Sequence, residues 1–399
     1  MHRLSTRAVH VVNEPPPNGS RPLSVPLVQS SAFAFDSADA LAEAMAGPDG
    51  RYVYSRRGNP TVRALEQTLA GLEGGAGALA FASGMGAVSG VLLALLRPGD
   101  RVLAQRCLYG GTYAVLSDLA ARYGIEVTYV DGVDARAIEV AAAEGPLPRL
   151  LVLETIANPT GLVPDLPALL SAARRLGITS VVDNSLASPV LCRPLELGAD
   201  VVVHSTTKYL SGHSDVLGGA AVFADDALRR AIWPRVVELG ACADPFAAWL
   251  TLRGIQTLPL RMRETCANAA VLAERFAARP DVTAVHYPWL PGHPSYATAR
   301  TVLSGGGGLL SVELAGGREA GRAFIEGVRV ARLALSLGGV ESLVAHPAST
   351  SHRELDARAL AAAGIAPGLV RLSVGIEDVE DLWADFEAAL SQAALSQAG

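Results

Sequence analysis

The sequence predicts an α/β fold with a mostly parallel β-sheet, followed by a smaller α/β region and preceded by an extended segment. From about Ala64 to Phe223, short runs rich in β-branched residues alternate with stretches of helical length, which is typical of a parallel sheet covered on both faces. The chain has 399 residues, more than a single core usually accommodates, so two units of structure are expected. Half of the residues are hydrophobic, which suits a large buried core.

The clearest repeating unit lies in the middle of the chain. Residues 150–154 predict a buried strand, residues 165–177 an amphipathic helix, and residues 179–183 the next strand. Asp165 supplies an N-cap for the helix and Gly177 a C-terminal stop. This order of elements is that of a parallel β-α-β unit.

Polar side chains stand at or just after the end of several predicted strands: Glu154, Asp183, Ser205 and Lys208. In open α/β sheets, ligands bind outside the carboxyl ends of the strands. We therefore expect one crevice to collect all four side chains.

The two ends of the chain differ from this central region. Residues 1–55 are rich in Pro, Ser and Ala and predict an extended arm, of a kind that often embraces a neighbouring subunit. Residues 56–240 form the predicted main domain, and residues 241–399 form a smaller C-terminal α/β domain with a strand over 307–314 and a helix over 377–391. The glycines at 305–308 enter that strand and do not open a helix, so a bend is expected there and not a phosphate site.

Composition excludes several classes of function. The net charge of −6 and the absence of a basic tract argue against a nucleic-acid or anionic-membrane partner. The longest apolar run, 91–96, is too short to span a bilayer, and residues 1–20 lack the apolar core of a signal peptide. The four cysteines are widely spaced, which indicates neither a zinc site nor a disulfide framework. A reduced, cytoplasmic enzyme without a metal is expected.

Lys208 and Asp183 together indicate a cofactor. Lys208 follows a β-branched run that ends in hydroxyl-bearing residues, and Asp183 ends a similar run 25 residues upstream. A lysine that forms a Schiff base and a carboxylate that pairs with a pyridinium nitrogen are what pyridoxal 5′-phosphate (PLP) requires. Each residue also has an ordinary interpretation, a solvated lysine and an Asp-Asn turn, and only their combination favours PLP.

Further residues fit the same chemistry. The segment from Ser83 to Ala87 joins a predicted strand to a helix, a geometry that offers backbone N–H groups to a phosphate. Tyr109 precedes two glycines in a loop, where it can stack on a flat ring or remain a half-buried core tyrosine. Arg56 suits a dianionic phosphate, and Arg371 suits the carboxylate of an amino acid or, alternatively, a surface ion pair.

Taken together, these motifs resemble the Cys/Met-metabolism, or trans-sulfuration, family of PLP enzymes, which includes cystathionine γ-synthase, cystathionine γ-lyase and methionine γ-lyase. The resemblance covers nearly the whole chain. The segments that carry it are 54–56 with 59–61, 83–85, 108–110, 158–159, 182–184, 204–210 with 212–215, 336–339 and 371–375. It implies the type I, aspartate-aminotransferase-like fold and, commonly, a homotetramer built as a dimer of dimers.

The family implies catalytic roles for three residues. Lys208 would hold the cofactor and then carry protons, Asp183 would keep the pyridine nitrogen protonated, and Tyr109 would stack on the ring and protonate the leaving group. Glu154 would support the cofactor face.

The remaining roles concern binding. Phosphate binding would use the subunit's own Gly84, Met85, Ser205 and Thr207, together with the neighbour's Tyr54 and Arg56. The substrate carboxylate would be held by Asn158, Ser336 and Arg371.

Two positions depart from the family pattern and bear on the substrate. Members that act on cystathionine tend to carry a glutamate where this chain has Leu335, so a substrate without a distal charge is favoured. Methionine γ-lyases tend to carry a cysteine where this chain has Gly111. The segment 345–352 is similar to homocysteine-forming sulfhydrylases and methionine lyases, whereas 209–215 is similar to the lyase and γ-synthase branch, a mixture that a specialised enzyme of secondary metabolism would explain.

Two reactions therefore remain open. One is a γ- or β-elimination that releases a thiol, a 2-oxo acid and ammonia, and the other is a γ-replacement in which a second nucleophile takes the place of the leaving group. A non-catalytic relative is disfavoured because Lys208, Asp183, Tyr109 and Arg371 are all present.

Overall fold

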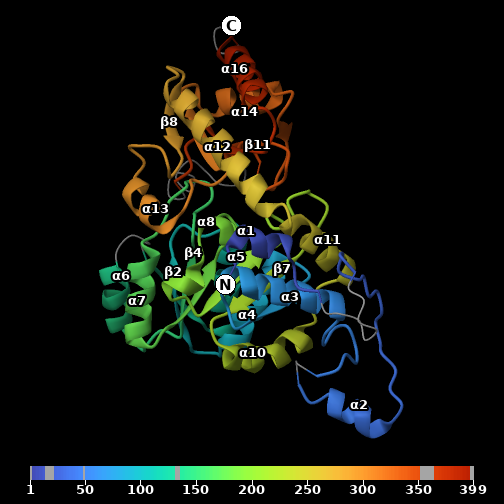
Figure 1. Cartoon of the computed structure of the whole chain (residues 1–399). Coiled ribbons are helices and arrows are strands. Elements are labelled where there is room, and N and C mark those ends of the chain that lie inside the picture. The colour runs from blue at the N-terminus through green and yellow to red at the C-terminus, as the bar shows by residue number, and fades with distance from the viewer. Residues whose placement is uncertain (1, 14–21, 48–49, 131–134, 351–363, 396–399) are drawn as a thin grey trace.

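Two β-sheets organise the chain, one in the first 225 residues and one after residue 280 (Figure 1). The computed structural model describes residues 2–13, 22–47, 50–130, 135–350 and 364–395. The larger sheet has seven strands in the order β1-β7-β6-β5-β4-β2-β3. Its strands are β1 (Gly77–Phe81), β2 (Arg101–Gln105), β3 (Glu126–Val130), β4 (Leu150–Glu154), β5 (Thr179–Asp183), β6 (Val201–Ser205) and β7 (Gly219–Phe223).

The larger sheet is mostly parallel, as predicted. Strands β3, β2, β4, β5 and β6 pair in parallel. Strand β7 is antiparallel to both of its neighbours, β1 and β6. The polar residues that end β4, β5 and β6 therefore lie along one edge of the sheet.

Helices cover both faces of this sheet. Neighbouring residues of a strand point to opposite faces and therefore pack in different cores. Val182 of β5 packs with helices α3 and α7 in one core, and Val181 packs with helices α4 and α5 in the other. The helices are α3 (Pro60–Glu73), α4 (Gly84–Leu95), α5 (Gly110–Tyr123), α6 (Ala135–Ala143), α7 (Leu166–Leu176), α8 (Ser188–Leu191), α9 (Pro194–Leu197) and α10 (Asp226–Leu239).

The unit β4-α7-β5 matches the sequence prediction closely. The Asp165 side chain accepts a hydrogen bond from the Ala168 backbone N–H at the start of α7. Gly177 ends the helix in the left-handed conformation, with φ of 72°, where glycine carries no Cβ penalty. Both predicted caps are confirmed.

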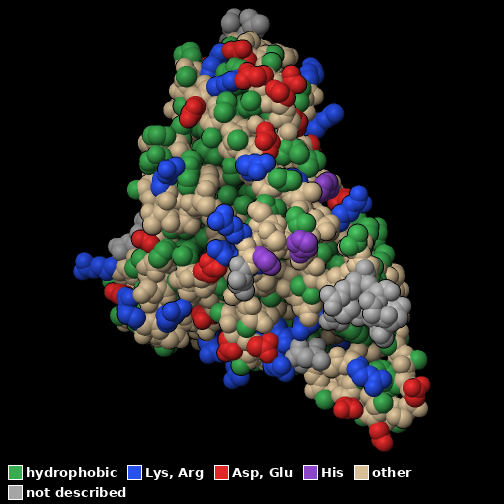
Figure 2. Space-filling view, in the orientation of Figure 1, with side chains coloured by type: hydrophobic (Ala, Val, Ile, Leu, Met, Phe, Trp, Pro, Cys, Tyr) green, Lys and Arg blue, Asp and Glu red, His purple; other side chains and the backbone are tan. Residues whose placement is uncertain are grey.

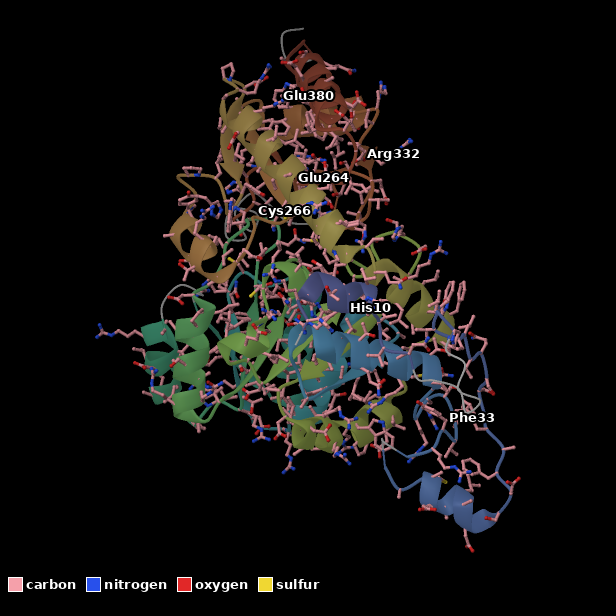
Figure 3. All side chains as sticks on the ribbon, viewed as in Figure 1. His10, Phe33, Glu264, Cys266, Arg332 and Glu380 are labelled. Atoms are coloured by element: carbon pink, nitrogen blue, oxygen red, sulfur yellow. The ribbon has the colours of Figure 1, made fainter. Side chains whose placement is uncertain are left out.

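The N-terminal segment is less extended than predicted. Helix α1 (Leu4–Val9) packs against the body with Ala8 fully buried, and α2 (Ala38–Ala44) forms a second short helix. Helix α2 and its flanks project from the body, including Phe33, which is labelled in Figure 3. The three consecutive prolines at 15–17 lie outside the described residues.

The second sheet has five strands in the order β10-β11-β12-β9-β8. Helices α12, α14 and α16 pack on it around Phe276, Phe324 and Phe386. The glycines at 305–308 lead into β9, as predicted. The elements are α11 (Pro245–Ile255), α12 (Leu258–Ala277), β8 (Val282–His286), α13 (Tyr296–Val302), β9 (Leu309–Leu314), α14 (Gly317–Gly327), β10 (Arg332–Leu333), β11 (Leu343–Ala345), the 3₁₀ helix η1 (Pro347–Ser349), β12 (Leu369–Ser373) and α16 (Val379–Leu395).

The surface is of mixed character. On the face seen in Figure 2, acidic and basic side chains lie among each other, and the coloured residues form no basic stripe. None of the described helices combines the length and hydrophobicity that crossing a membrane requires. The described residues also contain no cluster of His, Cys, Asp and Glu suited to a metal ion.

Candidate active site

Three of the predicted site residues end adjacent strands. Glu154, Asp183 and Ser205 are the last residues of β4, β5 and β6, and Glu154 is in register with Asp183. The chain then turns, with the Lys208 backbone N–H donating to the Ser205 carbonyl at 3.1 Å. The parallel sheet thus collects the three strand ends at one edge, with Lys208 three residues beyond it.

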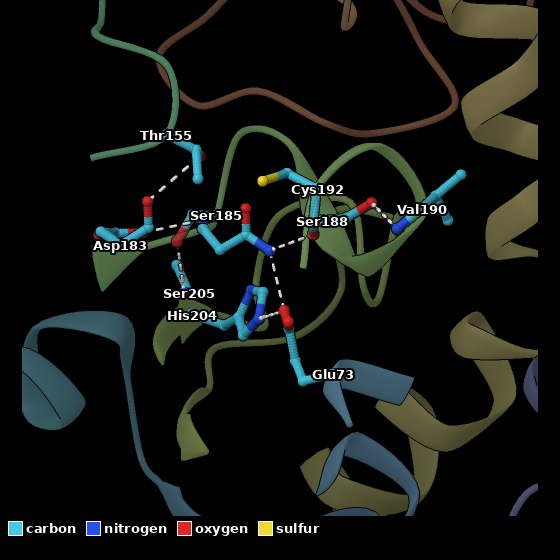
Figure 4. A network of polar contacts seen from close by, with 10 residues as sticks. Glu73, Thr155, Asp183, Ser185, Ser188, Val190, Cys192, His204 and Ser205 are labelled. Atoms are coloured by element: carbon cyan, nitrogen blue, oxygen red, sulfur yellow. Dashed lines mark hydrogen bonds and ion pairs between the residues drawn. The ribbon is translucent and has the colours of Figure 1, made fainter. Parts of the chain in front are cut away.

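Asp183 is held as an acceptor at the end of β5. Its Oδ1 accepts a hydrogen bond from the Ser185 backbone N–H at 2.9 Å, and Ser185 Oγ accepts one from the Ser205 N–H at 2.7 Å (Figure 4). Burial raises the pKa of Asp183, whereas the Ser185 hydrogen bonds and the charge of His204 lower it. A carboxylate in this position suits a cationic ring nitrogen.

Glu154 lies beside Asp183 but has a different role. Its Oε1 accepts a hydrogen bond from the Tyr109 backbone N–H at 2.5 Å. Burial and the neighbouring Asp183 charge raise the pKa of Glu154 well above its ordinary value. The pKa of Asp183 is also raised, but only that of Glu154 lies well above its ordinary value.

The N-terminus of α4 meets Ser205. Ser83 caps the helix, its Oγ accepting from the Gly86 N–H at 3.0 Å. A Cβ atom on Gly84 would lie 2.6 Å from Ser205 Cβ and 2.8 Å from its Oγ, so glycine is needed for this approach. Helix N–H groups and a hydroxyl at one point form an anion site. Thr207 lies next to Lys208, and its Oγ1 exchanges hydrogen bonds with the backbone of Gly218.

Lys208 points from the larger sheet to the C-terminal region. Its Nζ donates to Ser336 Oγ at 2.7 Å, and Arg371 Nη2 donates to the Ser336 carbonyl at 2.7 Å. Burial and the Arg371 charge lower the pKa of Lys208, which increases its neutral, nucleophilic fraction. Ser336 has φ of 101°, an uncommon conformation for a residue other than glycine.

Arg371 has an unused donor. Its Nε is buried and has no hydrogen-bond partner among the described residues, and burial lowers the pKa of its guanidinium. A buried N–H of this kind is costly unless a ligand satisfies it. The Asn158 loop lies nearby, since Ser311, the register partner of Arg371 on β9, donates to the Pro159 carbonyl at 2.9 Å.

Tyr109 stands at the start of α5 with 49% of its surface exposed. A Cβ atom on Gly111 would lie 2.5 Å from the Tyr109 ring and 2.7 Å from Met85 Sδ. The Tyr109 ring therefore lies against Gly111 and near Met85. A side chain at residue 111 would displace one of them.

Three predicted residues are exposed in the single chain. Tyr54 is 47% exposed and Arg56 lies over its ring at 5.7 Å. Tyr54 belongs to the segment that pairs with Ala32 in the projecting arm. Leu335 is 62% exposed and adjoins Ser336.

Sequence reasoning missed the groups behind the strand ends. Glu73 at the end of α3 contacts His204 and Asn184 (Figure 4), and Ser185 links Asp183 to Ser205. His204 and Asn184 belong to the motifs that carry the resemblance. For Glu73, however, no local pattern distinguishes a buried carboxylate from an ordinary surface residue at a helix end.

The model of the family described as "Cys/Met metabolism PLP-dependent enzyme" matches residues 5–391. The chain belongs to this family. Its predicted cofactor is therefore PLP, and the family resemblance of the sequence is confirmed. The chain is an enzyme, since the family and the relatives are PLP-dependent lyases and synthases of sulfur amino acid metabolism.

The similar proteins include enzymes named as lyases and enzymes named as synthases. The chain is 44% identical over 392 residues to L-methionine gamma-lyase from Pseudomonas putida, spanning 98% of each chain. It is 43% identical over 386 residues to cystathionine gamma-synthase from Mycobacterium bovis, spanning 97% of this chain and 96% of the relative. The solved cystathionine gamma synthase from Xanthomonas oryzae pv. oryzae, in complex with aminoacrylate and cysteine, aligns with a TM-score of 0.92, 42% identity and coverage of 99% and 100%. These matches confirm the type I fold.

The residues of this site fit PLP. The Asp183 carboxylate suits the ring nitrogen, the α4 N-terminus with Ser205 suits the phosphate, and Lys208 suits the aldehyde. Lys208 is the only lysine in the sequence, so a Schiff base on a lysine side chain has a single possible location.

Proposed function

We propose that this enzyme is a lyase that eliminates the γ- or β-substituent of a sulfur amino acid, breaking the C–S bond and releasing a thiol, a 2-oxo acid and ammonia. The observation that carries the proposal is the 44% identity to an L-methionine gamma-lyase across 98% of both chains. The apolar, exposed Leu335 beside Ser336 supports a substrate whose distal end is uncharged.

Lys208 has two roles in this proposal. Bound PLP supplies an aldehyde for the substrate amine and an electron-accepting ring. Lys208 Nζ holds the cofactor and then, as a free amine, takes the proton from the substrate α-carbon and returns it at a neighbouring carbon. Ser336 Oγ, 2.7 Å from Nζ, holds that amine in place between the two sheets.

The other residues position the reacting groups. Asp183 places its carboxylate beside the ring nitrogen, and Glu154 lies next to it. Arg371 binds the substrate carboxylate through its free Nε, and Ser336 and Asn158 complete that site. The Tyr109 ring covers the cofactor, and its hydroxyl donates a proton to the leaving sulfur. Glu154 also fixes the Tyr109 backbone.

The phosphate completes its contacts in a dimer. Gly84, Met85, Ser205 and Thr207 bind it from one subunit, and Tyr54 and Arg56 bind it from the partner. Arg56 Cζ lies 5.7 Å from the centre of the Tyr54 ring, which supports their acting together. The proposal includes residues 1–55 as the contributing arm, 56–240 as the PLP-binding domain, 241–399 as the C-terminal domain, and a homotetramer built from two such dimers. It also includes a reduced, cytoplasmic setting, supported by four cysteines without disulfides.

A second function is favoured by the cystathionine gamma-synthase relatives. In γ-replacement, the same residues act until the substituent has left, and a second substrate such as cysteine or sulfide then adds in place of water. In this alternative, the enzyme acts in secondary metabolism.

A product assay tests the proposal. Purified enzyme is incubated with methionine, cystathionine, cysteine or O-acylhomoserines, with and without an added thiol, and 2-oxo acid and ammonia are measured. The proposal expects oxo acid from an uncharged thioether without added thiol. Product that forms only when thiol is present would replace it with the transferase function. A Lys208→Ala variant serves as the inactive control.

A further inference from the structure

The turn that carries Lys208 contacts a buried arginine of the next region of the chain. Arg261 lies near the start of α12, and its side chain is buried. Its Nη1 donates a hydrogen bond to the Tyr209 carbonyl at 2.7 Å, and its Nη2 donates a longer one to the Leu210 carbonyl at 3.4 Å. These two carbonyls directly follow Lys208, so the guanidinium holds the backbone from which the lysine side chain extends.

The other hydrogen bonds of Arg261 attach it to the end of α11 and the start of α12. Its Nη2 also donates to the Gly254 carbonyl at 2.7 Å, and its Nε donates to Thr257 Oγ1 at 3.1 Å. Each nitrogen of the guanidinium therefore has an acceptor, as a buried donor requires. Burial lowers the pKa of Arg261 to about 10, so the side chain keeps its proton near neutral pH.

The backbone of the turn fits closely against this arginine. Gly212 has φ of 72°, and a Cβ atom there would lie 2.0 Å from Arg261 Nη1. The Gly212 N–H donates to the Lys208 carbonyl at 2.9 Å and closes the turn. A Cβ atom on Gly254 would lie 2.2 Å from the Ser211 carbonyl oxygen. Both glycines are therefore needed for the turn to approach the guanidinium and α11.

The loop between β10 and β11 also touches this turn. A Cβ atom on Gly338 would lie 2.7 Å from the Tyr209 nitrogen and 3.1 Å from the Lys208 carbonyl carbon. The same loop carries Ser336, whose Oγ accepts the hydrogen bond from Lys208 Nζ at 2.7 Å. The distance from Nζ to Ser336 therefore depends on how the turn lies against this loop.

We propose that Arg261 is a positioning residue, which holds the turn after Lys208 in the orientation that brings Lys208 Nζ to Ser336 and to the cofactor aldehyde. The proposal rests on the proposed PLP site. Within the described residues, the hydrogen bonds of Arg261 go to this turn and to residues 254 and 257. Loss of Arg261 should therefore impair the reactions of Nζ and spare the phosphate site at Ser205.

The variant Arg261→Gln separates these two effects, because glutamine is too short to bond both the turn and α11. Cofactor-free enzyme is mixed with PLP, and attachment to Lys208 is followed by absorbance. We expect the attachment rate and kcat to fall about 10- to 100-fold, as for a misplaced reacting group. Pyridoxine 5′-phosphate has an alcohol in place of the aldehyde and cannot form a Schiff base, so its Kd should change by less than about twofold.

Two results with Arg261→Gln would overturn the proposal. One is a wild-type attachment rate in the folded variant. The other is a loss of pyridoxine 5′-phosphate affinity as large as the loss of attachment rate, because Arg261 would then support the whole site and not the placement of Nζ. If the wild-type enzyme attaches no PLP, the PLP site itself is refuted, which is a separate outcome.

Arg229→Gln is the matched control. Arg229 is a second buried arginine, on α10, where its Nε donates to Asp226 Oδ1 at 2.6 Å. Its replacement should lower the melting temperature but leave the attachment rate within about twofold of wild type. An equally slow attachment in Arg229→Gln would assign the effect to general destabilisation and contradict the specific role of Arg261.

Arg261→Lys covers the case in which Arg261→Gln does not fold. Lysine keeps the charge and three donors but loses the planar fork that spans the turn and α11. Attachment should again be slowed, by a smaller factor than in the glutamine variant, with unchanged binding of pyridoxine 5′-phosphate. A wild-type attachment rate in Arg261→Lys when Arg261→Gln is unfolded, or failure of both variants to fold, would contradict the proposal, because Arg261 would then be required for folding and not for placing Lys208.

Discussion

The two β-sheets contribute to the site in different ways. The seven-stranded sheet presents Asp183 and Ser205 at adjacent strand ends, and their spacing follows from backbone pairing. The five-stranded sheet contributes Arg371 from the middle of β12, and Ser336 from a loop with positive φ. The first set is suited to a cofactor, whose position is fixed, and the second to a substrate that must enter and leave. Lys208 joins the two sets through its bond to Ser336.

Removing Lys208 should have the largest effect, because this residue joins the cofactor residues of the first sheet to the substrate residues of the second. Lys208→Ala should lose covalent cofactor attachment and lower turnover about 10³-fold or more. No other lysine exists in the sequence to replace it. Absorbance of the bound cofactor and steady-state rates measure both effects, and full activity in this variant would refute the mechanism.

Arg371→Lys should have the next largest effect, and it should impair the use of substrate without impairing the binding of cofactor. A lysine retains the charge but loses the planar fork that binds a carboxylate through two N–H groups. We expect kcat/KM to fall roughly 10- to 100-fold, as for loss of a charged hydrogen bond, while cofactor affinity stays within about twofold. Kinetics and a cofactor titration on the same preparation test this. A large loss of cofactor affinity would show that the five-stranded sheet also holds the cofactor.

Ser336→Ala should have a smaller effect. The variant removes the acceptor of the Lys208 Nζ hydrogen bond but leaves the backbone carbonyl that Arg371 uses. One such bond contributes about 0.5–1.5 kcal/mol, so kcat should fall about 2- to 12-fold. A rise in KM without a fall in kcat would assign Ser336 to substrate binding alone.

A shift in pH dependence is the smallest expected effect. The Arg371 charge disfavours the protonated form of Lys208 and lowers its pKa. Arg371→Gln should therefore raise the pH at which cofactor-free enzyme attaches PLP at half its maximal rate, since the neutral amine attacks. Stopped-flow absorbance over a pH series measures this, and an unchanged or lowered midpoint would argue against the coupling.

The sequence predicted features set by nearby residues better than features set by distant ones. The unit β4-α7-β5 was predictable because its caps and apolar periodicity are local. The antiparallel direction of β7 leaves no local pattern, and α1 forms in a short stretch without clear periodicity, stabilised by burial of Ala8. Glu73 escaped prediction because its partners lie 111 and 131 residues away.

Reduction of the enzyme with borohydride, followed by mass mapping, tests the central claim most directly. Reduction makes a lysine-bound cofactor permanent, and the chain offers one lysine. We predict that a single pyridoxyl phosphate group adds to each wild-type chain, on the peptide that contains Lys208. An unmodified Lys208, or a group attached only at the N-terminal amine, would contradict the assignment of Lys208 as the residue that joins the two halves of the site.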